Sequence, residues 1–245
     1  MNSQFTVPNP FRTSLFRDLF DFFFLPFCAI CRERLKEKER ILCEECWSSI
    51  PLLNPPFCQR CGSPMTKRFC QRCEEIEFQF LRGRSLGIYE GVLSEIVKLI
   101  KFKRKTTLAK RIGGMMSVLL RSDPILKNGD LLIPVPLHRT RKRERGYNQS
   151  LLLAEAISHS TEILLLDDLL LRTRATRPQT DLSSEDRREN VKGAFRVKGG
   201  ERIRGKRVVL VDDVFTTGST LEAGTEALLE GGAEGVFCLT AAVTT

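Results

Sequence analysis

The sequence predicts an α/β protein in which helices flank a parallel sheet and a small metal-binding domain precedes the sheet. Two apolar runs, Val208 to Val211 and Leu131 to Val135, have the near-continuous pattern of strands covered on both faces of a parallel sheet. Segments with helical spacing separate such runs. Eight of the nine cysteines form closely spaced pairs near the N-terminus, which is typical of a small domain held by metal.

Length and charge set broad limits on function. The 245 residues can form one medium domain with a small appendage, and 42% hydrophobic residues is ordinary for a folded protein. The net charge of +9 favours anionic partners such as nucleic acids, nucleotides or diphosphates, without choosing among them. No run approaches the roughly 18 apolar residues that span a bilayer. We therefore expect no membrane span.

The first 25 residues are expected to contain an amphipathic helix, around Thr13 to Phe24, that packs against its own domain. Acidic residues interrupt its apolar face, so a membrane-surface role is the less favoured alternative. The apolar patch from Leu19 to Phe27 contains an aspartate and a proline and lacks a small-residue cleavage site. We therefore expect no secretion signal.

Four Cys-x2-Cys pairs predict two structural zinc sites. Each pair brings two thiolates to one ion, and two pairs complete a closed tetrahedral site. Chain order favours grouping the first two pairs and the last two, with an interleaved arrangement as the alternative; disulfides or redox chemistry are less favoured. The cysteine spacing does not indicate whether these zinc sites bind DNA, bind another protein or only stabilise their own chain. The expected ligands are Cys28, Cys31, Cys43 and Cys46 for one ion, and Cys58, Cys61, Cys70 and Cys73 for the other.

Further elements follow in order. Phe78 to Tyr89 is expected to be a strand or hairpin, and helical spacing of apolar residues continues through Val92 to Lys103 and Leu108 to Leu120. Basic residues decorate this helix pair, either as a solvated face or as a track for nucleic acid, with Phe102 as the one aromatic among them. These basic residues are Lys101, Lys103, Arg104, Lys105, Lys110 and Arg111.

A dense basic segment, His138 to Gln149, follows the predicted strand Leu131 to Pro136. It could be an exposed loop. Cations after a strand are also how a fold neutralises a diphosphate at the carboxyl end of that strand, and we favour this interpretation. His138 is assigned no catalytic role.

The C-terminal half continues the alternation of strands and helices. A polar loop is expected over Arg172 to Leu182, then a helix that Ser183 caps and that ends at Gly193 to Phe195. Cys238 is expected to be a small buried apolar residue. The remaining elements are helices over Leu151 to Ile157 and Ser219 to Leu228, and strands over Ile163 to Leu166, Leu169 to Arg172 (a possible edge strand) and Val236 to Val243.

The segment Val208 to Thr220 is the predicted functional centre. It consists of a buried strand, two acids, a turn rich in hydroxyls and glycine, and a helix. In open parallel sheets ligands bind beyond the carboxyl ends of strands, and we place Asp212 and Asp213 where the strand stops. The backbone N–H groups that begin the helix can hold a phosphate. This pattern predicts a sugar-phosphate site.

The same segment resembles the phosphoribosyl diphosphate (PRPP) motif of type I phosphoribosyltransferases. With the cysteine pairs, Pro134-Val135-Pro136, Arg145-Gly146-Tyr147-Asn148-Gln149 and the series Gln179, Leu182, Arg187, Asn190 and Gly193-Ala194-Phe195, most of the chain resembles the competence protein F family. The resemblance implies a double zinc ribbon over residues 26–77 and a type I phosphoribosyltransferase-like domain over residues 78–245. It also implies a cytoplasmic role in DNA uptake during natural transformation.

Carried over to this chain, the resemblance assigns roles to particular residues. Asp212 and Asp213 would engage the ribose hydroxyls and help place Mg²⁺, and a loop that includes Leu137 and His138 would face the diphosphate. Purine-specific relatives place an acid where this chain has Thr216, so the loop is more similar to the orotate type. The 5′-phosphate would lie against Thr216, Thr217, Gly218, Ser219 and Thr220, and the basic residues near the diphosphate would include Arg139, Arg143 and Arg145.

Two functions are compatible with these features. The chain would be a PRPP-binding module whose zinc ribbons and basic segments hold single-stranded DNA or another competence protein. Alternatively, it would be an active phosphoribosyltransferase that releases diphosphate in a Mg²⁺-dependent reaction, with an acceptor that the sequence does not identify.

Overall fold

The computed structural model describes residues 26–37, 39–65, 68–174 and 193–245. The chain divides into two compact units, Met1–Ser49 and Ile50–Thr245. The N-terminal helix expected within residues 1–25 lies outside the described residues, as do most of the polar loop and the helix expected between Arg172 and Gly193. Within the described residues, no helix is long and apolar enough to cross a membrane.

The first unit is built around one cysteine cluster and very little core. Phe27 and Arg34 form an isolated antiparallel bridge, and Arg32 turns the chain back with a φ of 68°. The short helix α2 (Glu44–Ser48) follows, capped by the Cys43 thiol, which accepts a hydrogen bond from the Cys46 amide. Apart from cysteines, the buried apolar side chains among the described residues of this first unit are Leu35, Leu42 and Trp47.

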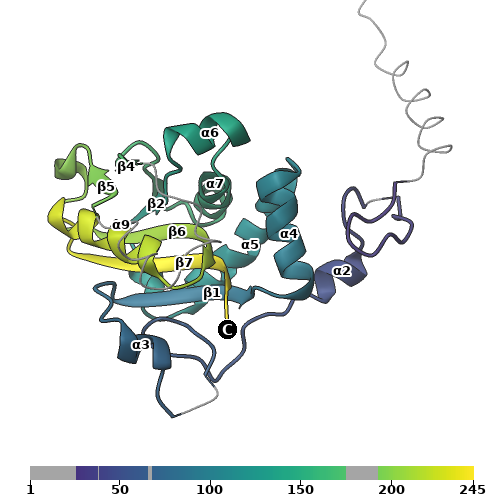
Figure 1. The fold of residues 1–245 in the computed structure, drawn as a ribbon, viewed down its shortest axis with the longest axis horizontal. Helices are drawn as coiled ribbons and strands as arrows, with labels where there is room; N and C mark the ends of the chain where they lie inside the picture. The colour runs from purple at the N-terminus through teal and green to yellow at the C-terminus, as the bar shows by residue number, and fades with distance from the viewer. Residues whose placement is uncertain (1–25, 38, 66–67, 175–192) are drawn as a thin grey trace, which may run out of the picture. The chain divides into compact units, whose positions relative to one another are not determined.

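The second unit contains a five-stranded parallel sheet with the strand order β1-β7-β6-β2-β3 (Figure 1). The two long central strands are buried along almost their whole length, as the apolar runs predicted. The parallel sheet expected from the sequence is confirmed. The strands are β1 (Arg82–Ile88), β2 (Leu131–Pro134), β3 (Leu164–Leu165), β6 (Arg207–Phe215) and β7 (Gly235–Val243).

Helices cover both faces of this sheet. Val208 and Leu210 face the same hydrophobic core as Leu221 and Leu228 of α9 (Ser219–Glu230). On the other face, α5 (Thr107–Ser122) contacts β1 and β7, while α7 (Gln149–Thr161) contacts β2 and β6. The helices predicted in these regions, and α4 (Gly91–Phe102), are confirmed. Short helices are α3 (Gln71–Glu75), η2 (Leu126–Asn128) and η4 (Gly200–Arg202).

Strand β6 extends further than expected. Its pairing with β2 ends at Pro134 and Val211, where the Val135 amide donates to the Val211 carbonyl (2.9 Å). Its pairing with β7 continues to Phe215. The expectation that the strand stops before Asp212 was therefore wrong, because β7 supports it on one side for four more residues. Both acids remain beyond the end of β2.

The chain leaves β2 and β6 in opposite directions. From β2 it passes through α7 to β3 on one side, and from β6 through α9 to β7 on the other. A crevice at such a switch point is the usual ligand site of an open parallel sheet. The elements thus position a site between β2 and β6.

Three local expectations are corrected. The basic segment after β2 forms helix α6 (Arg139–Arg145), which the His138 imidazole caps at one end and Gly146, with a φ of 86°, ends at the other. Phe195 begins strand β5 (Phe195–Val197) instead of ending a helix, because Ala194 and Phe195 pack into the core. Its antiparallel partner is β4 (Leu170–Arg172), so the predicted edge strand lies in a separate two-stranded sheet.

The second cysteine cluster, which consists of Cys58, Cys61, Cys70 and Cys73, lies directly against the outer edge of β1. The segment before it donates from Leu53 to the Leu86 carbonyl (3.0 Å), and Ile88 donates to the Pro51 carbonyl (2.8 Å). A Cβ atom at Gly62 would lie 2.6 Å from the Gly83 carbonyl oxygen, so this turn tolerates only glycine. The cluster is therefore part of the same compact unit as the sheet.

A buried ion pair stabilises the contact between β1 and the second cysteine cluster. Arg84 and Arg82 both bind Asp123 Oδ2, at 2.8 and 2.9 Å, and the Arg84 guanidinium lies over the Phe57 ring, 4.8 Å from its centroid. Arg84 also donates to the Gln59 carbonyl (3.2 Å), inside a Cys-x2-Cys turn. Burial alone would raise the pKa of Asp123, but hydrogen bonds from Arg82 and two backbone amides, together with the Arg84 charge, lower it.

Asp123→Asn should destabilise the protein by about 3 kcal/mol, because it leaves the buried Arg84 and the partly buried Arg82 without their counter-charge. The amide keeps an oxygen for the Ile125 and Leu126 amides. The contribution of Asp123 is present above its unfolded-state pKa and is lost as the pH falls through its lower folded-state pKa. Urea denaturation at pH 7 measures the change.

Asp168→Asn is the matched control, since its pair with Arg202 is exposed to solvent. The unfolding midpoint of this variant should stay at the wild-type value. If Asp123→Asn also left the midpoint unchanged, the ion pair would not stabilise the contact between β1 and the cluster.

Candidate functional site

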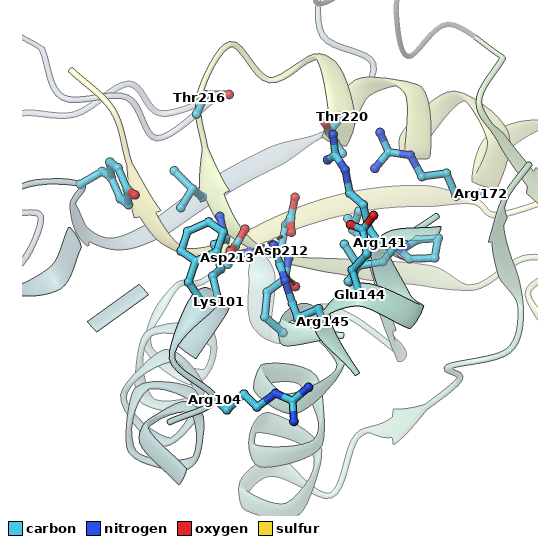
Figure 2. Close-up of a pocket in the computed structure, with 17 residues that line it drawn as sticks. Lys101, Arg104, Arg141, Glu144, Arg145, Arg172, Asp212, Asp213, Thr216 and Thr220 are labelled. Carbon is cyan, nitrogen blue, oxygen red and sulfur yellow. Dashed lines mark hydrogen bonds and ion pairs between the residues drawn. The ribbon is translucent and has the colours of Figure 1, made fainter. Parts of the chain in front are cut away.

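A cavity of about 670 Å³ opens at the carboxyl ends of β2 and β6, at the switch point of the sheet (Figure 2). Segments far apart in the sequence contribute to its wall. Acids come from β6, threonine hydroxyls from the loop before α9 and from its first turn, and cations from α4 and the residues after it, from α6 and from β4. The polar lining residues are Tyr89, Lys101, Arg104, Arg141, Glu144, Arg145, Gln149, Arg172, Asp212, Asp213, Thr216 and Thr220.

The two acids of β6 form the floor of this site, and each has a different partner. Asp212 Oδ1 accepts hydrogen bonds from Ser150 Oγ (2.7 Å) and from the Asp213 amide (2.9 Å). Asp213 Oδ2 pairs with Lys101 Nζ at 2.5 Å. Both aspartates are buried, with exposed fractions of 7% and 6%. The pair therefore carries negative charge that one lysine only partly neutralises.

Burial dominates the electrostatics of Asp212. Desolvation and the neighbouring Asp213 charge raise its pKa to about 7, although Ser150 and Lys101 act in the opposite direction. Desolvation would lower the pKa of Lys101, but the two aspartates raise it. The site thus holds a lysine cation beside an acid that titrates near neutral pH.

The segment Arg145 to Gln149 ties the helices around the acids together. The Tyr147 hydroxyl donates to the Ile100 carbonyl, next to Lys101 at the end of α4. The Arg145 guanidinium lies over the Phe102 ring, 5.4 Å from its centroid, and donates to the Gln149 side chain. These contacts fix the end of α4, and with it the lysine that neutralises Asp213.

Asn148 sets the position of Ser150. Its Nδ2 donates to the Val135 carbonyl just after β2 (3.0 Å), and its Oδ1 accepts from the Ser150 amide (3.1 Å) as the cap of α7. From the sequence alone Ser150 has no predicted site role, and Lys101 is only one of several basic residues on a helix pair. The Asn-x-Ser helix cap was a detectable signal, but the contacts to β6 depend on the tertiary fold.

Helix α6 directs only some of its cations into the cavity. Arg141, Glu144 and Arg145 line it, because residues three and four apart share one helix face. Arg139 and Arg143 are exposed and do not line it. Of the preceding residues, Leu137 lines the cavity, whereas His138 caps the helix. Arg104, after α4, and Arg172, in β4, were not predicted here.

The predicted phosphate loop, residues 216–220, also reaches this cavity. Thr216 and Thr220 line the cavity, and Thr217 Oγ1 is 2.8 Å from Ser219 Oγ. Gly218 has a φ of 88°, and a Cβ atom there would lie 2.6 Å from the Phe78 ring, so only glycine fits. The loop leads into the first turn of α9, whose backbone N–H groups can bind an anion.

The eight paired cysteines form two clusters, grouped as chain order predicted. In the first, Sγ atoms of Cys28 and Cys46 are 3.7 Å apart, and those of Cys31 and Cys43 are 3.5 Å apart. The corresponding distances in the second are 3.7 Å for Cys58 and Cys73 and 3.6 Å for Cys61 and Cys70. A tetrahedral zinc with Zn–S bonds of ~2.3 Å needs sulfur separations of about 3.8 Å. Both clusters therefore fit zinc.

Family comparisons match both parts of the chain. The model of the double zinc ribbon domain matches residues 19–76, and the model of the phosphoribosyl transferase domain matches residues 131–244. Among solved structures, the chain is similar to glutamine PRPP amidotransferase from B. subtilis, with 22% identity and a TM-score of 0.41. That match covers 59% of this chain and 30% of the other.

Curated relatives match most of the chain. Competence protein F of Haemophilus influenzae is 32% identical over 84% of this chain and 92% of its own length. DNA utilization protein YhgH of Escherichia coli K12 is 32% identical over 86% of this chain and 95% of its own. Competence protein ComFC of Bacillus subtilis is 27% identical, over 81% of each. The chain therefore belongs to the competence protein F family, with a double zinc ribbon followed by a phosphoribosyltransferase-type fold.

Proposed function

We propose that this protein binds PRPP with Mg²⁺ in the cavity between β2 and β6 and assists the handling of single-stranded DNA during natural transformation, in the cytoplasm. The observation that carries the proposal is the convergence of acids, hydroxyls and cations on one cavity. The buried Asp212 and Asp213, the hydroxyls of Thr216 and Thr220, and two arginines of α6 all line it. A ligand with ribose hydroxyls and separated phosphates matches this arrangement.

Each part of PRPP has a complementary surface in this cavity. Asp212 and Asp213 can accept hydrogen bonds from ribose hydroxyls, and the loop from Thr216 to Thr220 can receive the 5′-phosphate. Arg141 and Arg145 can bind the diphosphate, since guanidinium groups match phosphate oxygens. The two carboxylates are suitable oxygen ligands for Mg²⁺, which would neutralise part of the diphosphate charge.

The exposed end of α4 supports the DNA-handling part of the proposal. Phe102 is 68% exposed and borders the cavity, and Lys103, Arg104 and Lys105 follow it on the surface. An exposed ring among cations is how proteins bind single strands without sequence preference, by stacking bases and attracting phosphates. DNA would thus lie next to the ligand cavity.

A second candidate function is phosphoribosyl transfer to an acceptor. Tyr89, Phe102 and Val214 also line the cavity, so it offers rings and an apolar side chain besides the groups that suit PRPP. An aromatic acceptor could stack there. Thr216 stands where purine enzymes carry an acid, so we expect no purine to serve as the acceptor.

PRPP with Mg²⁺ should bind the purified protein, and replacing both acids together, by Asp212→Asn and Asp213→Asn, should abolish the heat of binding in calorimetry. The neutral amides cannot ligate Mg²⁺ as the carboxylates do. Asp130→Asn is the control, because Asp130 pairs with Arg207 at the opposite end of β6. Unchanged affinity in the double variant would show that these acids do not form the site.

The affinity for PRPP should rise about tenfold between pH 6 and pH 8. The reason is that Asp212, with a pKa of about 7, must lose its proton before its carboxylate can bind Mg²⁺ or accept a hydrogen bond from a ribose hydroxyl. Its raised pKa also means that Asp212 stabilises the free protein at low pH and that this contribution is lost as the pH rises through about 7. Calorimetry across this range tests the ionisation.

The Asp212→Asn variant controls for protons that the ligand itself binds or releases. Its weaker binding should follow only the ligand's titration. If the wild type and this variant showed the same pH dependence, the ionisation of Asp212 would play no part in binding.

Single-stranded DNA should bind with an affinity that falls with salt, with a log–log slope of about −0.7 for each phosphate neutralised. Phe102→Ala should cost about 1–3 kcal/mol of binding free energy if one base stacks on the ring. Phe69→Ala is the matched control, because Phe69 is 67% exposed and lies beside Arg68. Fluorescence anisotropy measures both; equal losses in the two variants would contradict a specific platform at α4.

Release of diphosphate from PRPP, measured with a panel of nucleobases, separates the two functions. The binding proposal predicts PRPP binding with no base-dependent release. Sustained release with one base would instead establish the transferase.

A further inference from the structure

The proposed phosphate loop rests on three buried phenylalanines. Phe78 and Phe80 stack with their ring centroids 4.6 Å apart, and the Phe215 ring lies 6.0 Å from Phe78 and 6.3 Å from Phe80. Gly218 approaches Phe78 and Phe215 so closely that a Cβ atom would lie 2.6 and 2.8 Å from their rings. Any shift of these rings would therefore displace the backbone of the loop.

One half of the second cysteine cluster reaches this aromatic group through Arg60. Arg60 lies between the buried ligands Cys58 and Cys61, and its guanidinium donates to the Phe78 carbonyl. The following residue, Gln79, donates from its amide to Glu222 in the first turn of α9 (2.8 Å). Phe78 and Gln79 are thus held between the second cysteine cluster and α9, the helix that follows the phosphate loop.

The other half reaches it through Arg72, which lies in α3 between Cys70 and Cys73. The Arg72 guanidinium lies over the Phe215 ring, 5.0 Å from its centroid, and donates to Ser63 Oγ (2.7 Å) and the Thr244 carbonyl (3.2 Å). The Thr244 amide in turn donates to the Phe215 carbonyl (3.0 Å). Arg72 therefore fixes both the ring and the backbone of the residue that precedes the loop.

We propose that Arg72 is a positioning residue for the phosphate loop, so that occupancy of the second cysteine cluster by zinc and ligand binding at residues 216–220 favour each other. The inference deepens the proposed function and rests on it, because the loop must bind a phosphate. The physical reason is the chain of rigid contacts. Holding α3 by two thiolates keeps Arg72 on Phe215, and Phe215 with Phe78 keeps Gly218 in its left-handed conformation.

Arg72→Met should raise the Kd for PRPP with Mg²⁺ at least about fivefold, the lower end of the range for coupled sites. Arg72→Lys should have a similar effect, because a lysine keeps the charge but lacks the planar group that stacks on Phe215. Arg68→Met is the matched control, since Arg68 lies over the exposed Phe69 ring (5.8 Å) near the same cluster. Its Kd should equal that of the wild type.

Zinc competition on the wild-type protein tests the same coupling without any variant of Arg72. A chromophoric chelator is titrated to equilibrium with and without PRPP and Mg²⁺, and Cys43→Ser, which removes a ligand of the first cluster, identifies which zinc ion belongs to the second. PRPP with Mg²⁺ should raise the affinity of the second cluster for zinc. Because linkage is reciprocal, the factor should equal the one by which zinc raises the affinity for PRPP. The first cluster, in the separate compact unit, should not respond.

The outcomes separate this inference from the function on which it rests. If the wild type binds PRPP but Arg72→Met binds equally well and the ligand leaves zinc affinity unchanged, the positioning role is overturned and the proposed function stands. Full recovery of affinity in Arg72→Lys would also overturn it, because a simple charge effect would then suffice. A wild type that does not bind PRPP would overturn both proposals.

Discussion

Two adjacent carboxylates are buried at the end of β6, and the rest of the site is arranged around them. Burial raises the free energy of charged carboxylates, so the fold must supply partners for them. Lys101 from α4 and Ser150 from α7 provide these partners, and the Arg145 to Gln149 segment holds both helices in place. The surroundings of the acids thus explain several residues that do not themselves face the ligand cavity.

The topology makes this burial useful. β2 ends at Pro134, whereas β7 pairs with β6 as far as Phe215. The acids are therefore supported by β7 on one edge of β6 and border an open crevice on the edge where β2 has ended. A strand fixes backbone position better than a loop, which favours a preorganised site. The start of α9 and the arginines of α6 line the same cavity.

The sequence predicted the parallel sheet, its long strands, the flanking helices and both cysteine groupings, because apolar periodicity and ligand spacing are local signals. It did not predict α6, because a run of Arg, Lys and Glu forms helix readily but has no apolar period to detect. Lys101, Ser150 and Arg172 could not be assigned to the site from sequence alone, since tertiary contacts bring them to the cavity. The same is true of the contact between β1 and the second cluster, which depends on Gly62 and Gly83.

If one cavity holds both ends of PRPP, a crystal structure of the protein with PRPP and Mg²⁺ will show both phosphate groups in it. We expect the 5′-phosphate at Thr216 to Thr220, the ribose hydroxyls at Asp212 and Asp213, and the diphosphate beside Arg141 and Arg145. Ligand density away from the ends of β2 and β6, or a phosphate bound only by the exposed Arg139 and Arg143, would contradict this expectation.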